Sequence, residues 1–159
     1  MSAPVEIALA ERKPEVLEGI AECHVESNAY AYKFYTPTKE EIKEKAEKWL
    51  ADEAGVVLVA KVGKEVVGYI YATKMNHTIF EIKYLEVKSA WQRKGIGSAL
   101  IKAAEHLAKQ RGFKKLGLFT SRNNAQALNF YRKNGFRIHG FIAEYYSWGE
   151  AAVFLAKEL

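Results

Sequence analysis

A short run of polar and basic residues with two closely spaced glycines offers the clearest chemistry in the sequence. Residues 92–98 read Gln-Arg-Lys-Gly-Ile-Gly-Ser. Arg93 and Lys94 supply formal positive charge, and Gly95 and Gly97 lack the Cβ atoms that would keep a bulky anion away from the backbone. If a helix begins here, its first amides have no partners and its dipole adds partial positive charge. The segment therefore predicts a cradle for a pyrophosphate group.

The residues on either side of this cradle have the patterns of a strand and a helix. The residues before it alternate as in a strand, which predicts Ile82 and Tyr84 on one face and Leu85 and Val87 on the other. The residues after it carry an apolar stripe with helical spacing as far as Gly112, which stands where a C-terminal cap is expected. The sequence patterns of Walker loops and of dinucleotide-binding loops are absent.

The remaining hydrophobic patterns predict further strands and helices around this unit. Pro14 suits the first turn of one helix, and Thr38 and Glu41 form a capping box for another. The crossover through the helix after the cradle implies one parallel pair of strands in an otherwise antiparallel sheet. The expected fold is thus α/β (α+β) with a mixed, mostly antiparallel sheet. In chain order, we expect a strand (5–9), two helices (from 14 and from 38), three strands (56–62, 65–72 and 79–87), a helix (96–111), a strand (116–120), a helix (125–134) and two strands (137–143 and 151–155).

Length and composition indicate a single globular domain over residues 1–159, with 49% hydrophobic and 27% charged residues. One cysteine, Cys23, excludes an internal disulfide and fits a reducing, cytoplasmic compartment. We find no signal peptide, no membrane-spanning run and no spacing of ligands for a metal. The net charge of +5 comes from dispersed residues, so nucleic acid is not expected as a partner. The oligomeric state stays open, a homodimer included.

Two motifs together resemble the signatures of a known superfamily. Residues 92–97, after the strand that ends at Val87, resemble the acetyl-CoA-binding motif of the GNAT superfamily of N-acyltransferases. Residues 124–136 read Asn-Ala-Gln-Ala-Leu-Asn-Phe-Tyr-Arg-Lys-Asn-Gly-Phe and resemble its second signature, N-x-x-A-x-x-F-Y-x-K-x-G-F. The resemblance covers the chain from about residue 56 to the end. It implies the GNAT fold, acetyl-CoA as co-substrate and transfer of the acetyl group to a primary amine.

The resemblance also implies which residues would contact the cofactor. The backbone of Leu85 and Val87 would pair with the pantetheine amides, and the Val87 amide would hold the thioester oxygen. Asn124 would either cap its helix or hydrogen-bond the pantetheine arm. Tyr131 would face the sulfur and stabilise the leaving thiolate. The expected cofactor-binding residues are Leu85, Val87, Gln92, Arg93, Lys94, Gly95, Ile96, Gly97, Ser98, Asn124 and Tyr131.

Two glutamates on the strand before the cradle are candidates for the base that deprotonates the amine. Glu81 precedes Gly95 by fourteen residues and matches the glutamate that serves as base in the histone-acetylating branch of the superfamily. Glu86 is the second candidate. Strand parity predicts that Glu81 and Glu86 point to opposite faces, so we do not expect both to serve one amine directly.

Aromatic residues in two loops are candidates for binding the acceptor. Tyr30 and Tyr32 lie in an aromatic stretch that either packs on itself or walls an acceptor cleft. Tyr145 and Tyr146 resemble, with the Gly-Glu that follows, the Y-Y-x-x-G-E-D-A loop with which protein N-terminal acetyltransferases grip a peptide backbone. Phe119 stands where several of those enzymes place a base, which favours Glu81. The expected acceptor is a protein or peptide amine. The alternatives are a polyamine or other small amine, and a CoA-binding sensor without catalysis.

Overall fold

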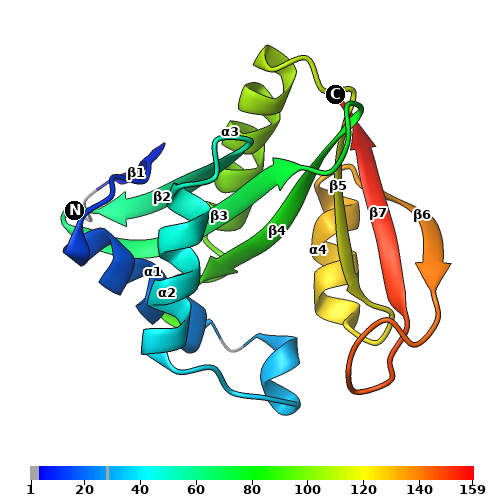
Figure 1. Ribbon diagram of the computed structural model, residues 1–159, viewed down its shortest axis with the longest axis horizontal. Helices are drawn as coiled ribbons and strands as arrows, with labels where there is room; N and C mark the ends of the chain where they lie inside the picture. The colour runs from blue at the N-terminus through cyan, green and yellow to red at the C-terminus, as the bar shows by residue number, and fades with distance from the viewer. Residues whose placement is uncertain (1–3, 28) are drawn as a thin grey trace.

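A seven-stranded sheet runs through the molecule with helices on both faces, as the computed structural model of residues 4–27 and 29–159 shows (Figure 1). The strand order is β1-β2-β3-β4-β5-β7-β6, and only the β4–β5 pair is parallel. The predicted mixed sheet and element order are confirmed. The elements are β1 (Val5–Leu9), α1 (Pro14–Glu26), η1 (Tyr30–Lys33, a 3₁₀ helix), α2 (Lys39–Leu50), β2 (Gly55–Val62), β3 (Glu65–Lys74), β4 (Ile79–Val87), η2 (Ser89–Trp91, a 3₁₀ helix), α3 (Ile96–Gln110), β5 (Lys115–Ser121), α4 (Ala125–Lys133), β6 (Arg137–Ile142) and β7 (Ala152–Glu158).

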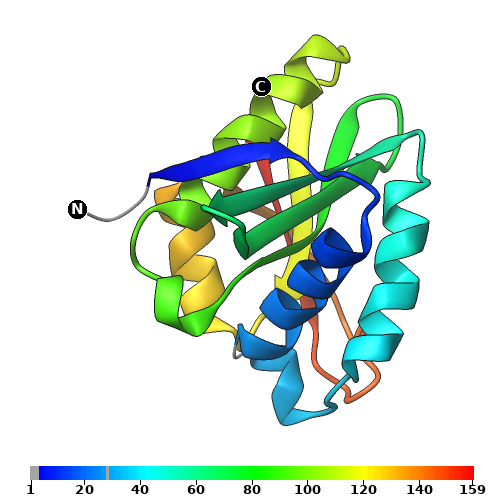
Figure 2. The same cartoon turned by 90° about the vertical axis from the view of Figure 1, so that its left-hand side faces the viewer.

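The sheet buries a separate apolar cluster on each face. Helices α1 and α2 cover one face, where Ile20 and Trp49 pack against Tyr69 of β3. Helix α3, with α4, covers the other face, where Leu100 packs with Phe80 of β4. Figure 2 shows α1 and α2 on the opposite side of the sheet from α3. Each of these buried side chains contributes roughly 1.5–3 kcal/mol. Because both faces are covered, a site for ligands must lie at an end or an edge of the sheet.

Local sequence signals set the ends of several helices. Thr38 Oγ1 accepts a hydrogen bond from the Glu41 amide at 3.2 Å, and the Glu41 carboxylate accepts one from the Thr38 amide at 3.2 Å, which completes the predicted capping box. Gly112 and Gly135 follow α3 and α4 with φ of 85° and 92°. This left-handed conformation suits glycine and stops a helix. The helices that flank the cradle therefore have the boundaries that the sequence predicts to within a residue or two.

Strand β4 contains a bulge that the sequence does not reveal. Tyr71 of β3 pairs with Tyr84, whereas its neighbour Ala72 pairs with Ile82, so Lys83 is an extra residue. An extra residue reverses the alternation of side chains along a strand. Ile82 accordingly packs in the cluster beneath α3, and Tyr84 packs against the cluster beneath α1 and α2. The prediction that these two residues share a face is wrong.

The bulge also corrects the predicted relation between the two glutamates of β4. Glu81 pairs with Thr73 of β3, and Glu86 pairs with Tyr69. Thr73 and Tyr69 are four residues apart on an unbulged strand, so they share a face, and the residues paired with them share it too. Glu81 and Glu86 therefore lie on the same face, beneath α1 and α2, and not on opposite faces as strand parity predicts.

Strands β4 and β5 separate along their length. They pair only through residues 79–81 and 115–117. In Figure 1 the two strands lie together near the C-terminus and diverge toward the opposite end of the sheet. In the part of the chain that the structure describes, β4 beyond Glu81 has no strand partner on the side of β5. The sheet therefore opens into a wedge between its two halves.

Candidate active site

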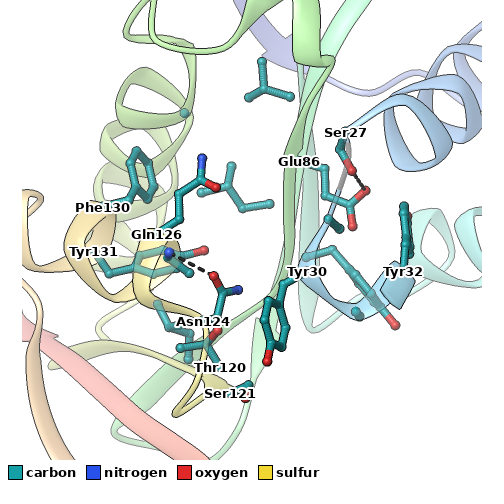
Figure 3. A pocket seen from close by; sticks show the side chains of 18 of the residues that line it. Ser27, Tyr30, Tyr32, Glu86, Thr120, Ser121, Asn124, Gln126, Phe130 and Tyr131 are labelled. Carbon is teal, nitrogen blue, oxygen red and sulfur yellow. Dashed lines mark hydrogen bonds between the residues drawn. The ribbon is translucent and has the colours of Figure 1, made fainter. Parts of the chain in front are cut away.

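A cleft of about 1370 Å³ opens where β4 and β5 diverge. Residues 82–87 of β4 line it on one side, and the end of β5 with α4 lines it on the other (Figure 3). The turn before α3, the η1 segment and the loop between β6 and β7 also contribute to its lining. The volume exceeds the ~300–1,000 Å³ of a pocket for one small ligand. The cleft can therefore hold two reactants at once.

The turn before α3 presents free amides to this cleft. Arg93 and Gly95 have positive φ values of 61° and 82°, and such alternation turns successive amides toward one point. In the described chain, the amides of residues 95–98 donate no backbone hydrogen bond. An anion at this point would meet several N–H groups and the positive end of the α3 dipole. Arg93 is an L-residue in a left-handed conformation, a strain often found at functional sites.

The two glycines of the cradle have different structural roles. A Cβ atom on Gly95 would meet nothing within 4 Å. A glycine suits this position because the backbone there has a left-handed φ. A Cβ atom on Gly97 would lie 2.9 Å from Cζ of Phe130 in α4. Gly97 therefore allows α4 to pack closely against α3, which sets the width of the cleft. The sequence analysis assigned both glycines to the approach of an anion.

Gln92 ties the cradle to the rest of the site. Its Nε2 donates to the carbonyl oxygens of Ser27, at 2.8 Å, and of Val87, at 2.9 Å. The side chain thus holds the end of α1 against the end of β4. Next to it, Lys94 Nζ lies 5.6 Å from the centroid of the Trp91 ring, which lines the cleft.

The free edge of β4 turns two amides into the cleft. The Lys88 amide donates to the Val67 carbonyl at 2.9 Å, so the peptide groups of Lys88 and of Glu86 face β3. The alternate residues, Leu85 and Val87, direct their amides to the other side, where β5 has diverged. An extended ligand could pair with this edge as an added strand does.

Glu86 lies on the cleft wall formed by β4 and is nearly buried, with 11% of its side chain exposed. Its Oε2 lies 2.9 Å from Nδ1 of His24 and accepts a hydrogen bond from Ser27 Oγ at 3.2 Å. Burial raises the pKa of Glu86, and the contacts with His24 and Ser27 offset part of that rise. A carboxylate with a raised pKa in a cleft is a suitable general base.

Glu81 has a different environment. It is not among the described residues that line the cleft, and its Oε2 lies 3.5 Å from Nζ of Lys83. Lys83, the bulged residue, does line the cleft. The structure therefore brings Glu86 to the cleft and leaves Glu81 outside its lining.

Tyr131 of α4 lies across the cleft from Glu86 (Figure 3). Its side chain is largely buried, and in the described chain its hydroxyl has no hydrogen-bond partner. Burial, with a smaller effect of the Glu86 charge, raises the pKa of Tyr131, so the phenol remains a proton-bearing donor. Asn124 caps α4, because its Oδ1 accepts a hydrogen bond from the Ala127 amide at 3.1 Å, and it also lines the cleft.

Tyr30 and Tyr32 lie on the η1 side of the cleft and both line it. The Tyr30 hydroxyl donates to Oε2 of Glu150 at 2.8 Å, so it connects η1 with the loop between β6 and β7. The Tyr32 hydroxyl donates to the carbonyl oxygen of His24. Both tyrosines are thus fixed by hydrogen bonds.

The two tyrosines of the β6–β7 loop differ in position. Tyr146 lines the cleft and stacks on Trp148 at 4.7 Å, and Trp148 stacks on Phe34 at 4.5 Å. Tyr145 is 47% exposed, stacks on Phe119 at 5.3 Å, and is not among the described lining residues. Of the four tyrosines proposed for acceptor binding, the structure brings three to the cleft.

Glu150 organises this side of the cleft, which sequence reasoning did not anticipate. Its carboxylate accepts hydrogen bonds from Tyr30, Ser121, Asn123 and Trp148. Burial opposes ionisation, but these hydrogen bonds lower the pKa of Glu150 from 4.5 to about 2. The donors come from three separate segments of the chain, so only the folded structure shows the cluster.

The described residues contain neither a cluster of metal ligands nor a helix able to span a membrane. No group of three or more His, Cys, Asp or Glu side chains is placed to hold a metal ion within residues 4–27 and 29–159. Among the described helices, none has the length and apolar character needed to cross a bilayer.

Solved structures with a similar fold include one that holds coenzyme A. An aminoglycoside 6'-N-acetyltransferase complexed with coenzyme A superimposes with a TM-score of 0.80 at 19% identity over 96% of both chains, which shows a shared fold. Ard1 from Thermoplasma volcanium superimposes with a TM-score of 0.77 at 25% identity, over 98% of this chain and 97% of that chain.

Sequence comparison also finds acetyltransferases. The uncharacterized N-acetyltransferase YvbK of Bacillus subtilis is 32% identical over 98 residues, which are 59% of this chain and 63% of that protein. The chain spans between about a quarter and two thirds of the length of the curated relatives that it matches. Residues 22–136 match the model of the acetyltransferase (GNAT) family, a segment that contains the cradle, Glu86 and Tyr131. The chain therefore belongs to the GNAT acetyltransferase family.

Proposed function

We propose that the protein transfers the acetyl group of acetyl-CoA to the primary amine of a protein or peptide, with Glu86 as the base and Tyr131 as the donor to the leaving sulfur. The observation that supports this proposal is the placement of Glu86 and Tyr131 on opposite walls of one cleft, beside the free edge of β4 (Figure 3). Both predicted candidates for the base remain testable, and the cleft lining favours Glu86 over Glu81.

The cofactor would lie along the wall of the cleft nearest α3 and α4. Its pyrophosphate would bind the amides of residues 95–98, with charge supplied by Arg93 and Lys94. Its pantetheine arm would pair with the backbone of Leu85 and Val87 on the free edge of β4. The Val87 amide would then hold the thioester oxygen, where negative charge develops during the reaction.

The acceptor amine must lose a proton before it attacks. Glu86 takes that proton from the ammonium group, directly or through one water, and the neutral nitrogen attacks the thioester carbon. The carbon–sulfur bond of the tetrahedral intermediate then breaks, and its electrons pass to sulfur. Tyr131 donates a hydrogen bond to the thiolate, which receives the second proton of the amine. The products are the amide and free CoA, and Glu86 releases its proton to solvent.

Two observations favour a peptide acceptor. Tyr30, Tyr32 and Tyr146 line the cleft, and tyrosines there can meet the groups of a peptide backbone. A single carboxylate also suits an α-amine, because deprotonation at pH 7 costs about 1 kcal/mol for an α-amine and about 4.6 kcal/mol for a lysine. The α-amine of a peptide is therefore the proposed acceptor, ahead of a polyamine.

The test measures release of free thiol from acetyl-CoA with a panel of peptides and small amines. The best peptide should exceed spermidine and other polyamines in kcat/KM, and a polyamine preference would contradict the acceptor class. Glu86→Gln should lower kcat about 10²- to 10⁴-fold. Glu81→Gln is the matched comparison, because it removes the same charge from the same face of β4 outside the cleft lining. A large loss in Glu81→Gln with full activity in Glu86→Gln would reverse the assignment of the base.

A further inference from the structure

A buried histidine, which itself lines the cleft, contacts the proposed base. His24 of α1 is 2% exposed, and its Nδ1 lies 2.9 Å from Glu86 Oε2 and 2.8 Å from the hydroxyl of Tyr69. Among the described residues, His24 is the histidine whose ring contacts Glu86.

The other ring nitrogen fixes which tautomer fits this environment. His24 Nε2 is buried and, in the described chain, has no hydrogen-bond partner. If Nε2 carried the proton, the bare Nδ1 could accept from the Tyr69 hydroxyl, but it would also face a carboxylate oxygen at 2.9 Å, and the buried Nε2–H donor would be unpaired. If Nδ1 carries the proton, it donates to Glu86, and only an acceptor is left without a partner. The tautomer with the proton on Nδ1 is therefore the stable one.

We infer that His24 is a positioning residue for catalysis, which donates from Nδ1 to Glu86 Oε2 and so holds the carboxylate charged and oriented toward the cleft. This inference rests on the proposed role of Glu86 as the base. Ser27 Oγ adds a second donor at 3.2 Å to the same oxygen. With Oε2 held by one donor from α1 and one from Ser27, the residue that follows it, Oε1 is left to take the proton of the acceptor amine.

The other titratable groups around Glu86 do not compete for protons in the acidic range. The phenols around Glu86 come from η1, the segment just after η1, β3, β4 and, across the cleft, α4, and burial raises the pKa of each of them. Burial also raises the pKa of the Cys23 thiol to about 12. The acidic limb of the rate profile, in which the rate falls as the pH falls, therefore reports the protonation of Glu86. The phenols are those of Tyr32, Tyr35, Tyr69, Tyr84 and Tyr131.

The test compares the pH dependence of kcat/KM in three variants, with one acceptor throughout. His24→Leu removes the donor to the buried carboxylate, so its acidic limb should move to higher pH by about one to two units. His24→Asn places an amide N–H near the position of Nδ1, so its limb should return toward that of the wild type. Tyr69→Phe leaves the contact between His24 and Glu86 in place, so its limb should stay with the wild type.

A second measurement keeps the inference testable if a variant folds poorly. In the wild-type protein, ¹⁵N chemical shifts of the His24 ring should show a protonated Nδ1 and a bare Nε2 at neutral pH. The opposite tautomer would overturn the inference. So would an acidic limb in folded His24→Leu, with normal CoA binding, that matches the wild type. Wild-type turnover in Glu86→Gln would instead overturn the proposed function, so the two failures are distinguishable.

Discussion

In the proposed reaction, the phenol of Tyr131 donates a hydrogen bond to the leaving thiolate, and its raised pKa determines how it can act. Because burial disfavours the phenolate, Tyr131 offers a hydrogen bond and does not give up its proton at neutral pH. Tyr131→Phe should therefore lower kcat about 10- to 100-fold, since hydrogen bonds to charged groups are the strong ones. The KM for acetyl-CoA should change little, because the bond forms only as sulfur becomes charged.

Steady-state kinetics on purified Tyr131→Phe would measure this effect. Tyr145→Phe is the matched control, because Tyr145 is exposed and stacks on Phe119 away from the cleft lining. An unchanged kcat in Tyr131→Phe would mean that another group stabilises the thiolate.

The two glycines of the cradle should respond differently to the same substitution. Gly97→Ala places a methyl group 2.9 Å from the Phe130 ring, so α4 must shift, at a cost of about 1–3 kcal/mol in unfolding free energy. Gly95→Ala meets no neighbour but must adopt a φ of 82°, at a cost of about 1–2 kcal/mol.

Phe130→Leu distinguishes the two costs. In a double-mutant cycle followed by urea denaturation, Phe130→Leu should relieve much of the penalty of Gly97→Ala and none of that of Gly95→Ala. Equal penalties in the presence and absence of Phe130 would show that helix packing is not what requires a glycine at position 97.

At the scale of secondary-structure elements, the Glu150 carboxylate joins η1, the end of β5 and the β6–β7 loop. The pKa of Glu150 is lowered from 4.5 to about 2 in the folded protein. The ionised carboxylate therefore stabilises the fold above about pH 4.5, and this contribution is lost as the pH falls toward 2. Glu150→Gln should lower the melting temperature at neutral pH, and its difference from the wild type should shrink across that range.

Thermal unfolding measured between pH 2 and pH 7 would give the difference in melting temperature between Glu150→Gln and the wild type. Glu144→Gln provides the control, because it removes an exposed charge from the same loop. A difference between Glu150→Gln and the wild type that is constant down to pH 2 would contradict the role of the charge.

The elements show which parts of the site a sequence can predict. The cradle was predictable because its glycines, its basic residues and the start of α3 are adjacent in the chain and act through local geometry. The Asn124 cap and the Thr38 capping box are local for the same reason. The bulge at Lys83 has no comparable signal, because neither glycine nor proline marks it, and it forms only against β3. It determines that Glu86, on the face covered by α1, reaches His24.

Contacts between segments far apart in the chain were the second part of the site that the sequence could not predict. Gln92 has the residue type of a cofactor ligand in the motif, yet its amide reaches the carbonyl of Ser27, which is 65 residues away in the chain. Tyr30 and Glu150 are 120 residues apart and hydrogen-bonded. No periodicity encodes such pairs, because they depend on how the loops at one end of the sheet meet. The hydrogen bond between Tyr30 and Glu150 fixes the η1 side of the cleft in this way.

At the scale of the whole molecule, the sheet consists of two halves joined by a short parallel pairing. Strands β1 to β4 form one half and β5 to β7 the other, and only residues 79–81 and 115–117 connect them. Acetyl-CoA in the wedge would add the strand that is missing between the halves. Ligand at 100 times its Kd should then raise the unfolding free energy by about 2.7 kcal/mol.

The free edge of β4 gives this arrangement a signature that can be measured residue by residue. The amides of Glu86 and Lys88 face β3, whereas those of Leu85 and Val87 face the wedge. In hydrogen exchange without ligand, Glu86 and Lys88 should therefore be protected, and Leu85 and Val87 should exchange rapidly. CoA should protect Leu85 and Val87 selectively, because their amides then donate to the pantetheine arm. Uniform protection of all four residues, or none at Leu85 and Val87, would show that the cofactor does not pair with this edge.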